Sequence, residues 1–106
     1  MYVRMTFFRT KEGKMDDLRW QYNDRVLPLH KNHKDIRFVH LLESRDSPNE
    51  GVSVTAWDTK PDMENYEKSS DYEKLLAIFE DYFGGMPVQK SHKIAASSEP
   101  LILRIF

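Results

Sequence analysis

Histidines are the side chains of this 106-residue chain best suited to acid–base chemistry, because a neutral imidazole accepts a proton near neutral pH. His40 and His92 fall in segments whose composition is typical of strands, so each could face a cavity. For each of them, a structural histidine with satisfied hydrogen bonds is the more common outcome. His30 and His33 lie near the end of a predicted helix, where we expect them to face solvent. His40 and His92 are therefore the candidate catalytic residues.

A second group of side chains could contact an organic molecule. Trp57 could stack on a planar ring, although such a residue more often belongs to a core or an interface. Tyr66 and Tyr72 could donate phenolic hydrogen bonds into a pocket between helices and a sheet, with helix packing as the alternative. Arg4 lies in a strand-like segment that is otherwise poor in charge, so it could bind an anionic oxygen or form an ion pair. These four residues are the candidate substrate contacts.

Several other kinds of site find no support in the sequence. The absence of Cys excludes disulfides, thiolate metal sites and a thiol nucleophile. The sequence shows no pair of His residues on one helix face and no cluster of His and carboxylate residues that would indicate a metal site. It also shows no Gly-rich phosphate loop and no Ser/His/Asp pattern above chance. We therefore expect neither a metal nor a cofactor.

Charge and hydropathy also limit the partners that we expect. Sixteen Lys and Arg residues are balanced by seventeen Asp and Glu residues without a long basic run, so we expect no nucleic-acid binding. No apolar run approaches the ~20 residues of a membrane-spanning helix. Residues 1–6 do not resemble a signal peptide, because Arg4 interrupts the apolar run. We expect a cytoplasmic protein that makes no contact with a membrane.

The first half of the chain alternates between strand-like and helix-like patterns. Apolar and polar residues alternate over residues 2–10, which predicts a strand. Residues 15–29 carry apolar side chains at three- and four-residue spacings, which predicts an amphipathic helix that Pro28 kinks or ends. Residues 36–45 and 52–58 are predicted strands, and the turn residues between them indicate a hairpin.

The second half predicts two further helices and a strand. Thr59 is a candidate N-cap for a short helix over residues 60–68. Ser70 and Glu73 match a capping box that begins the next helix, and the Gly84–Gly85 pair is expected to end it. Residues 88–96 form the last predicted strand, and residues 96–106 are expected to form a strand-like arm.

The order of these elements predicts the architecture. A βαββαβ chain of this length forms one domain, residues 1–106, of the α+β, ferredoxin-like class, with its helices on one face of an antiparallel sheet. Because side chains alternate between the two faces of a strand, we expect that the helices cannot cover all of the apolar residues Phe8, Val39, Leu41 and Trp57. We expect a second copy of the chain to cover the helix-free face and the arm to lie across that partner.

Three segments resemble a known family. These are the turn at residues 11–14, the strand and helix over residues 53–66, with a Trp–Asp–Thr run and an aromatic residue on the helix, and the Ser-Ser-Asp-Tyr segment at residues 69–72. Together they resemble the antibiotic-biosynthesis-monooxygenase-like (ABM) domains of the dimeric α+β barrel superfamily over residues 2–97. Glu12 replaces the usual proline of the turn. The resemblance implies a homodimer whose sheets face each other.

The same resemblance suggests a function. Some members of the family oxidise quinols or polyketide-like aromatics without a cofactor, and others degrade haem. The haem-degrading members resemble one another in a trio of Asn, Trp and His, and this chain has Thr6, Tyr66 and Leu76 near those three positions. The histidine that would be the axial ligand of the haem iron is therefore missing. The resemblance thus implies a cofactor-independent monooxygenase-like domain that acts on a small apolar or aromatic (quinol- or polyketide-like) molecule. The alternative is a non-catalytic, small-molecule-binding or stress-associated homodimer on the same scaffold.

Overall fold

The computed structural model describes residues 1–98, apart from the side chain of His30. The strands are β1 (Tyr2–Arg9), β2 (Ile36–Glu43), β3 (Glu50–Trp57) and β4 (Val88–Lys93). The helices are α1 (Met15–Gln21), the π-helix η1 (Tyr22–Val26), α2 (Leu27–Asn32), α3 (Lys60–Glu67) and α4 (Ser70–Glu80). Residues 99–106 of the arm predicted over residues 96–106 lie outside the described residues.

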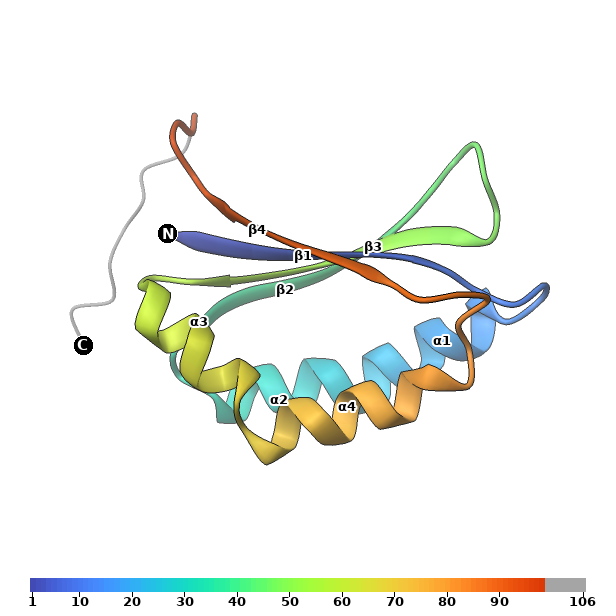
Figure 1. Cartoon of the computed structure of the whole chain (residues 1–106), viewed down its shortest axis with the longest axis horizontal. Coiled ribbons are helices and arrows are strands. Elements are labelled where there is room, and N and C mark those ends of the chain that lie inside the picture. The colour runs from blue at the N-terminus through green and yellow to red at the C-terminus, as the bar shows by residue number, and fades with distance from the viewer. Residues whose placement is uncertain (99–106) are drawn as a thin grey trace.

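The four strands form one antiparallel sheet in the order β2-β3-β1-β4. The helices formed by residues 1–98 all lie on one face of this sheet, and none of these residues forms a helix on the other face (Figure 1). This arrangement confirms the predicted ferredoxin-like α+β class. β2 and β3 form the predicted hairpin, with a bulge between Ile36 and Phe38.

The first helical segment continues beyond Pro28, so of the two predicted effects of this proline, a kink or an end, the end is wrong. Pro28 lies in the first turn of α2, and the helix runs on to Asn32. Proline removes an N–H donor and clashes with the carbonyl one turn earlier. The π-helix η1 ends two residues before Pro28, and its wider turn interrupts the regular α-helical hydrogen bonds there. The helix can therefore accommodate the proline without ending.

The boundaries of the last two helices are fixed by two hydroxyl caps. The Thr59 hydroxyl accepts a hydrogen bond from the Asp62 N–H at 3.2 Å, as the sequence predicted. Ser69, and not Ser70, caps α4, because its hydroxyl accepts from the Tyr72 N–H at 3.3 Å. The predicted stop at Gly84 is also wrong: α4 ends at Glu80, and the Gly84 N–H donates to the carbonyl of Arg9 in β1.

The core consists of two clusters between the sheet and the helices. One contains Phe8 and Phe79 together with Met15, Leu18, Tyr22 and Val26 of the first helical segment. The other contains Ile36, Trp57 and Met63 at the opposite end of the sheet. Val39 and Leu41 also pack against these clusters.

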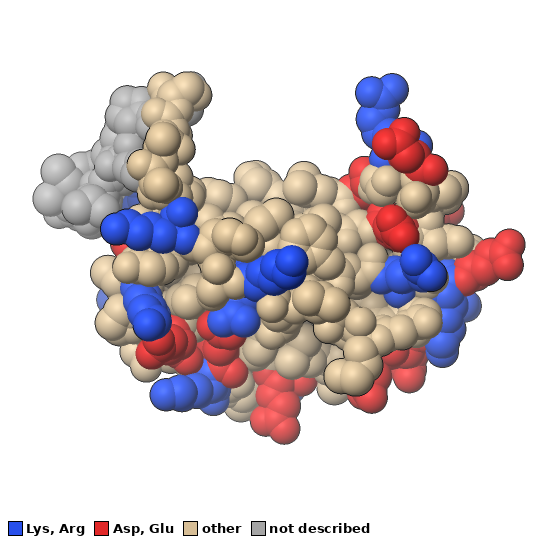
Figure 2. All heavy atoms as spheres, turned by 45° about the horizontal axis from the view of Figure 1, so that its top comes forward, with Lys and Arg blue, Asp and Glu red and all other residues tan. Residues whose placement is uncertain are grey.

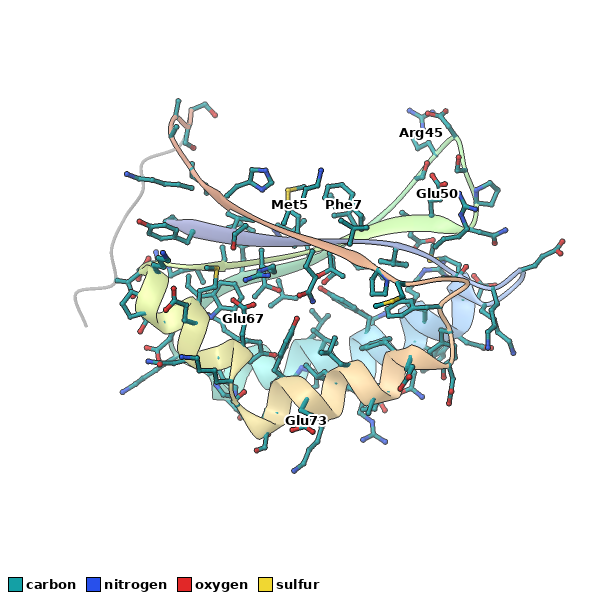
Figure 3. The ribbon with its side chains drawn as sticks, viewed as in Figure 1. Met5, Phe7, Arg45, Glu50, Glu67 and Glu73 are labelled. Carbon is teal, nitrogen blue, oxygen red and sulfur yellow. The ribbon has the colours of Figure 1, made fainter. Side chains whose placement is uncertain are left out.

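This arrangement corrects one step of the sequence analysis. Phe8, Val39, Leu41 and Trp57 all lie on the helix side of the sheet, because their strand positions are in register with one another. The apolar residues of the helix-free face are a different set. Met5 and Phe7 point away from the helices (Figure 3), and the strand alternation places Val52, Val54 and Leu42 beside them.

Gly51 allows the closest approach within the sheet. A Cβ atom at this position would lie 2.6 Å from Cζ of Phe8 and 2.8 Å from the carbonyl oxygen of Leu42. We therefore expect Gly51→Ala to lower the free energy of unfolding by about 1–3 kcal/mol, because Phe8 must move out of its packed position. Urea denaturation measures this loss.

Gly85→Ala is the matched control, because no atom lies within 4 Å of the added Cβ. We expect this variant to unfold at or slightly above the wild-type urea midpoint. Equal midpoints for the two variants would contradict the close packing of Phe8 on Gly51.

Candidate active site

A cavity of about 90 Å³ lies between the inner face of the sheet and the helices. Its floor is formed by strand residues of mixed character: Arg4, Thr6, Ser53, Thr55 and Trp57. Its roof is mostly aromatic and aliphatic, and includes Tyr66 and Tyr72 with Leu75, Leu76 and Phe79. The space is therefore apolar on the helix side and carries polar groups on the sheet side.

All four candidate substrate contacts line this cavity. Arg4 comes from β1 and Trp57 from the end of β3, whereas Tyr66 lies on α3 and Tyr72 on α4. The rings form a continuous group: the Tyr66 ring lies 5.6 Å from that of Trp57 and 5.5 Å from that of Tyr72, centroid to centroid. The sheet and both C-terminal helices therefore contribute to one aromatic wall.

Arg4 forms the charged contact of the cavity with Glu67, the last residue of α3. Its Nη2 lies 2.6 Å from Oε1 and 2.5 Å from Oε2 of the carboxylate. The side chains are 21% and 19% exposed, so this pair is largely withdrawn from water. Figure 3 shows Glu67 between α3 and the sheet. Glu67 is not among the residues predicted from the sequence, since one acidic residue at a helix end gives no signal of its own.

Two nitrogen donors at this site remain without an acceptor among residues 1–98. They are Nε of Arg4 and Nε1 of Trp57, and both atoms are buried. Burying an N–H group without a hydrogen bond costs free energy. Both nitrogens belong to residues that line the cavity.

Burial keeps the tyrosine hydroxyls of the cavity protonated. It raises the pKa of Tyr66 above its usual value of about 10, and the neighbouring Tyr72 adds to this effect. Burial also raises the pKa of Tyr72, against the opposing effect of the hydrogen bond that the Gln89 amide donates to its hydroxyl. Both tyrosines are thus available at neutral pH as hydrogen-bond donors and not as bases.

Tyr22 connects the first helical segment to the floor of the cavity. Its hydroxyl donates to the carbonyl of His40 at 3.1 Å and lies 3.0 Å from Oγ of Ser53, which is then the donor of the second bond. Burial raises the pKa of Tyr22 to about 12, and the hydrogen bond from Ser53 works against this shift. Tyr22 lies at the start of η1, so the π-helical turn presents this hydroxyl to the sheet.

The cavity approaches solvent between α4 and β4. Leu76 of α4 lines the cavity although it is 40% exposed. Gln89 of the edge strand β4 is also exposed and lines the cavity. The hydrogen bond between Gln89 and Tyr72 joins the two elements across this opening.

The candidate catalytic histidines do not join this group. His40 and His92 lie on the helix-free face, exposed, with the His40 ring stacked on Phe38 at 4.8 Å between centroids. The physical reason is strand alternation: His40 pairs with Val54, and His92 pairs with Val3, so each shares the face of its apolar partner.

His33 is not the fully solvated side chain that the sequence suggested. It is 30% exposed, and its Nε2 lies 3.0 Å from Oδ2 of Asp71 at the start of α4. Its ring meets the Tyr66 ring edge-on at 5.3 Å. His33 therefore packs against Tyr66 of the aromatic wall but does not line the cavity.

Within residues 1–98, no group of three or more His, Asp or Glu side chains is arranged to hold a metal ion. No helix within the same range is long and apolar enough to cross a membrane.

Solved structures share this fold at low sequence identity. Two proteins assigned to the antibiotic biosynthesis monooxygenases, from Nitrosomonas europaea and Bordetella bronchiseptica, superpose with TM-scores of 0.77 and 0.79 at 16% and 17% identity. These alignments cover 91% and 90% of this chain and 100% and 97% of the two proteins. Rv0793 from Mycobacterium tuberculosis gives a TM-score of 0.76 at 14% identity, over 92% of this chain and 98% of its own.

At the level of sequence, the curated proteins give no significant match. The sequence pattern of the family described as antibiotic biosynthesis monooxygenase matches residues 1–77, which carry β1 to β3, α3 and the first part of α4. This segment supplies Arg4, Trp57, Tyr66, Glu67 and Tyr72 of the cavity. The chain belongs to the antibiotic biosynthesis monooxygenase family.

Proposed function

We propose that this protein is a cofactor-independent monooxygenase that oxidises a small phenol or quinol in the cavity between its sheet and helices. The observation that carries the proposal is the convergence of Arg4, Trp57, Tyr66 and Tyr72 on that one cavity. Family membership supports the monooxygenase class, and the cavity supports the kind of substrate.

The size of the cavity favours a single-ring substrate. A volume of about 90 Å³ is below the ~150 Å³ of a protein cavity that holds benzene. A single ring can enter if side chains at the opening, such as Leu76, move outward. A flavin or a multi-ring polyketide would need the helices to separate from the sheet, so we favour phenols and quinols among the candidate substrates.

The lining suits an aromatic ring that carries hydroxyl groups. The rings of Trp57, Tyr66 and Tyr72 offer faces and edges for aromatic contacts. Arg4 and the protonated tyrosines can donate hydrogen bonds to the ring oxygens, which favours the ionised form that reacts with oxygen. His40 and His92 have no part in this proposal, because they lie on the opposite face of the sheet.

The working form that we propose is a homodimer through the helix-free face. This face carries large apolar side chains in contact with water, with Phe7 38%, Leu42 49% and Val88 53% exposed. In Figure 2 the centre of this side is largely uncharged, with a few Lys and Arg side chains, while acidic side chains gather at its margins. A second sheet packed here would bury these side chains and leave the cavity on the outer side of each sheet.

Phe7→Glu tests the dimer. The variant would place an unpaired carboxylate in the proposed interface, so we expect its dimer dissociation constant to rise roughly a hundredfold. Sedimentation equilibrium at micromolar concentration measures this change, and circular dichroism checks that the fold is intact.

Trp20→Glu is the matched control, because it makes the same kind of change at a side chain of α1 that is 75% exposed. We expect this variant to remain a dimer. A monomeric wild-type protein at micromolar concentration would overturn the proposed interface.

Oxygen consumption tests the catalytic proposal. We expect the purified protein, free of metal and flavin, to consume oxygen with a methyl-substituted hydroquinone faster than the uncatalysed oxidation. Thr55→Leu should lower kcat/KM at least tenfold, because the larger side chain fills the cavity. Ala77→Leu is its control, at an exposed position of α4 that does not line the cavity, and we expect it to keep the wild-type rate.

The same assay addresses the alternatives. A His40→Gln/His92→Gln double variant should keep its turnover, and a loss would restore the histidines as catalytic candidates. Thermal stabilisation by the quinol in the wild type but not in Thr55→Leu, without turnover, would identify a binding protein. Neither turnover nor stabilisation would overturn the proposed function.

The protonated state of the tyrosines makes a separate prediction. Their raised pKa values mean that ionisation opposes the fold, so the stabilisation is present below about pH 10 and is lost as the pH rises further. We expect Tyr22, Tyr66 and Tyr72 to ionise above the range of free tyrosine in a spectrophotometric titration. Tyr66→Phe should flatten the loss of stability above pH 10. Ionisation of every tyrosine near pH 10 in the folded protein would contradict this account.

A further inference from the structure

Glu67 occupies a position that helix formation does not explain. It is the last residue of α3, where the helix dipole disfavours a carboxylate. Its side chain lies between α3 and the sheet, whereas Glu73 of α4 extends away from the sheet into solvent (Figure 3). Glu67 is also the one carboxylate among the described residues that line the cavity. The ion pair with Arg4 offsets the cost of this position and holds the carboxylate in the lining of the cavity.

Arg4 supplies the other half of the arrangement. Its Nη2 holds the Glu67 carboxylate at 2.5–2.6 Å, but its buried Nε has no acceptor among residues 1–98. Nε1 of Trp57 is unsatisfied in the same way, and Trp57 lines the same cavity. Both residues line the cavity, and an anionic ligand oxygen bound there would be attracted to the Arg4 guanidinium.

We propose that Glu67 and Arg4 form a proton-transfer pair, in which Glu67 takes the proton of an acidic phenol or enol hydroxyl and Arg4 holds the resulting oxyanion. This proposal rests on the proposed function, because it uses the same cavity, and it identifies Glu67 as the base that deprotonates the substrate. The other titratable side chains lining the cavity do not compete for this role. Tyr22, Tyr66 and Tyr72 are protonated there, and an arginine remains a cation.

The step balances without a further reactant. The ligand O–H bond breaks and an O–H bond forms on a carboxylate oxygen of Glu67, so the proton stays inside the cavity. The electron pair remains on the ligand oxygen, which becomes a phenolate or enolate. As Glu67 loses its charge, its hold on Arg4 weakens, and the guanidinium pairs with the new anion. The total charge of the site is unchanged.

The test is anaerobic binding of 4-nitrophenol, a single-ring phenol whose phenolate absorbs visible light. It is performed below the solution pKa of the phenol, in weak buffer with a pH indicator. We expect the wild type to bind the ligand as the phenolate with no net proton release, because Glu67 holds the proton. Glu67→Gln should still bind the phenolate but release about one proton per ligand. Arg4→Gln should lose the phenolate absorbance.

Matched controls come from charged side chains elsewhere in the chain. Glu73→Gln and Arg45→Gln change exposed residues that Figure 3 shows outside the cavity, and both should behave as the wild type. Arg4→Lys keeps the charge and should recover part of the phenolate absorbance. Thermal unfolding of each variant verifies its fold. If Glu67→Gln does not fold, Glu67→Asp replaces it, and we expect part of the proton to appear in solution because the shorter carboxylate lies farther from the ligand.

The outcomes separate this inference from the proposed function. Ligand bound as the neutral phenol, no binding at saturating concentration, or an unchanged proton count in the Glu67 variant would each overturn the proton-transfer pair. Phenolate formation with the expected proton count, but no oxygen consumption with quinols, would overturn the oxygenase and leave the pair standing. Oxygen consumption without phenolate formation would do the reverse.

Discussion

The alternation of side chains along β1 and β3 decides which groups meet inside this protein. In the middle of both strands the polar residues Arg4, Thr6, Ser53 and Thr55 face the helices, and the apolar residues between them, such as Met5 and Val54, face away. The usual arrangement of a half-buried sheet places its apolar positions under the helices. In this protein the polar side chains of these strands lie in the helix–sheet interface instead. The helix-free face of the sheet is therefore apolar, and another protein surface would be needed to bury it.

A cavity can persist in this interface because short side chains lie between large ones. Phe8 packs under Phe79 and Tyr22 at one end, and Trp57 packs under Met63 at the other. These bulky clusters set the distance between the helices and the sheet, and the hydroxyl-bearing residues between them are too short to fill it. The π-helix η1 begins at Tyr22, whose hydroxyl donates a hydrogen bond to the sheet at the carbonyl of His40. The helix then continues past Pro28 to Asn32.

The candidate substrate contacts could be nominated from sequence because their residue types are unusual in their surroundings. Arg4 stands out in an apolar strand, and aromatic residues such as Tyr66 follow soon after β3. Glu67 could not be found in this way, because a glutamate in a charged helix is ordinary until the fold brings it to Arg4, 63 positions earlier in the chain. His40 was misplaced for a related reason. A strand sequence gives the alternation of two faces but does not say which one the helices cover.

The sequence by itself determined the order of strands and helices, the hairpin, the N-cap at Thr59 and the ferredoxin-like class, because these depend on local periodicity and turn chemistry. Tertiary structure decided everything that depends on facing and on distance. The register of β2 against β3 turned Leu41 toward the helices and His40 away from them. The packing of α3 on the sheet brought the Glu67 carboxylate to Arg4. Such contacts join residues far apart in the chain, and no local pattern encodes them.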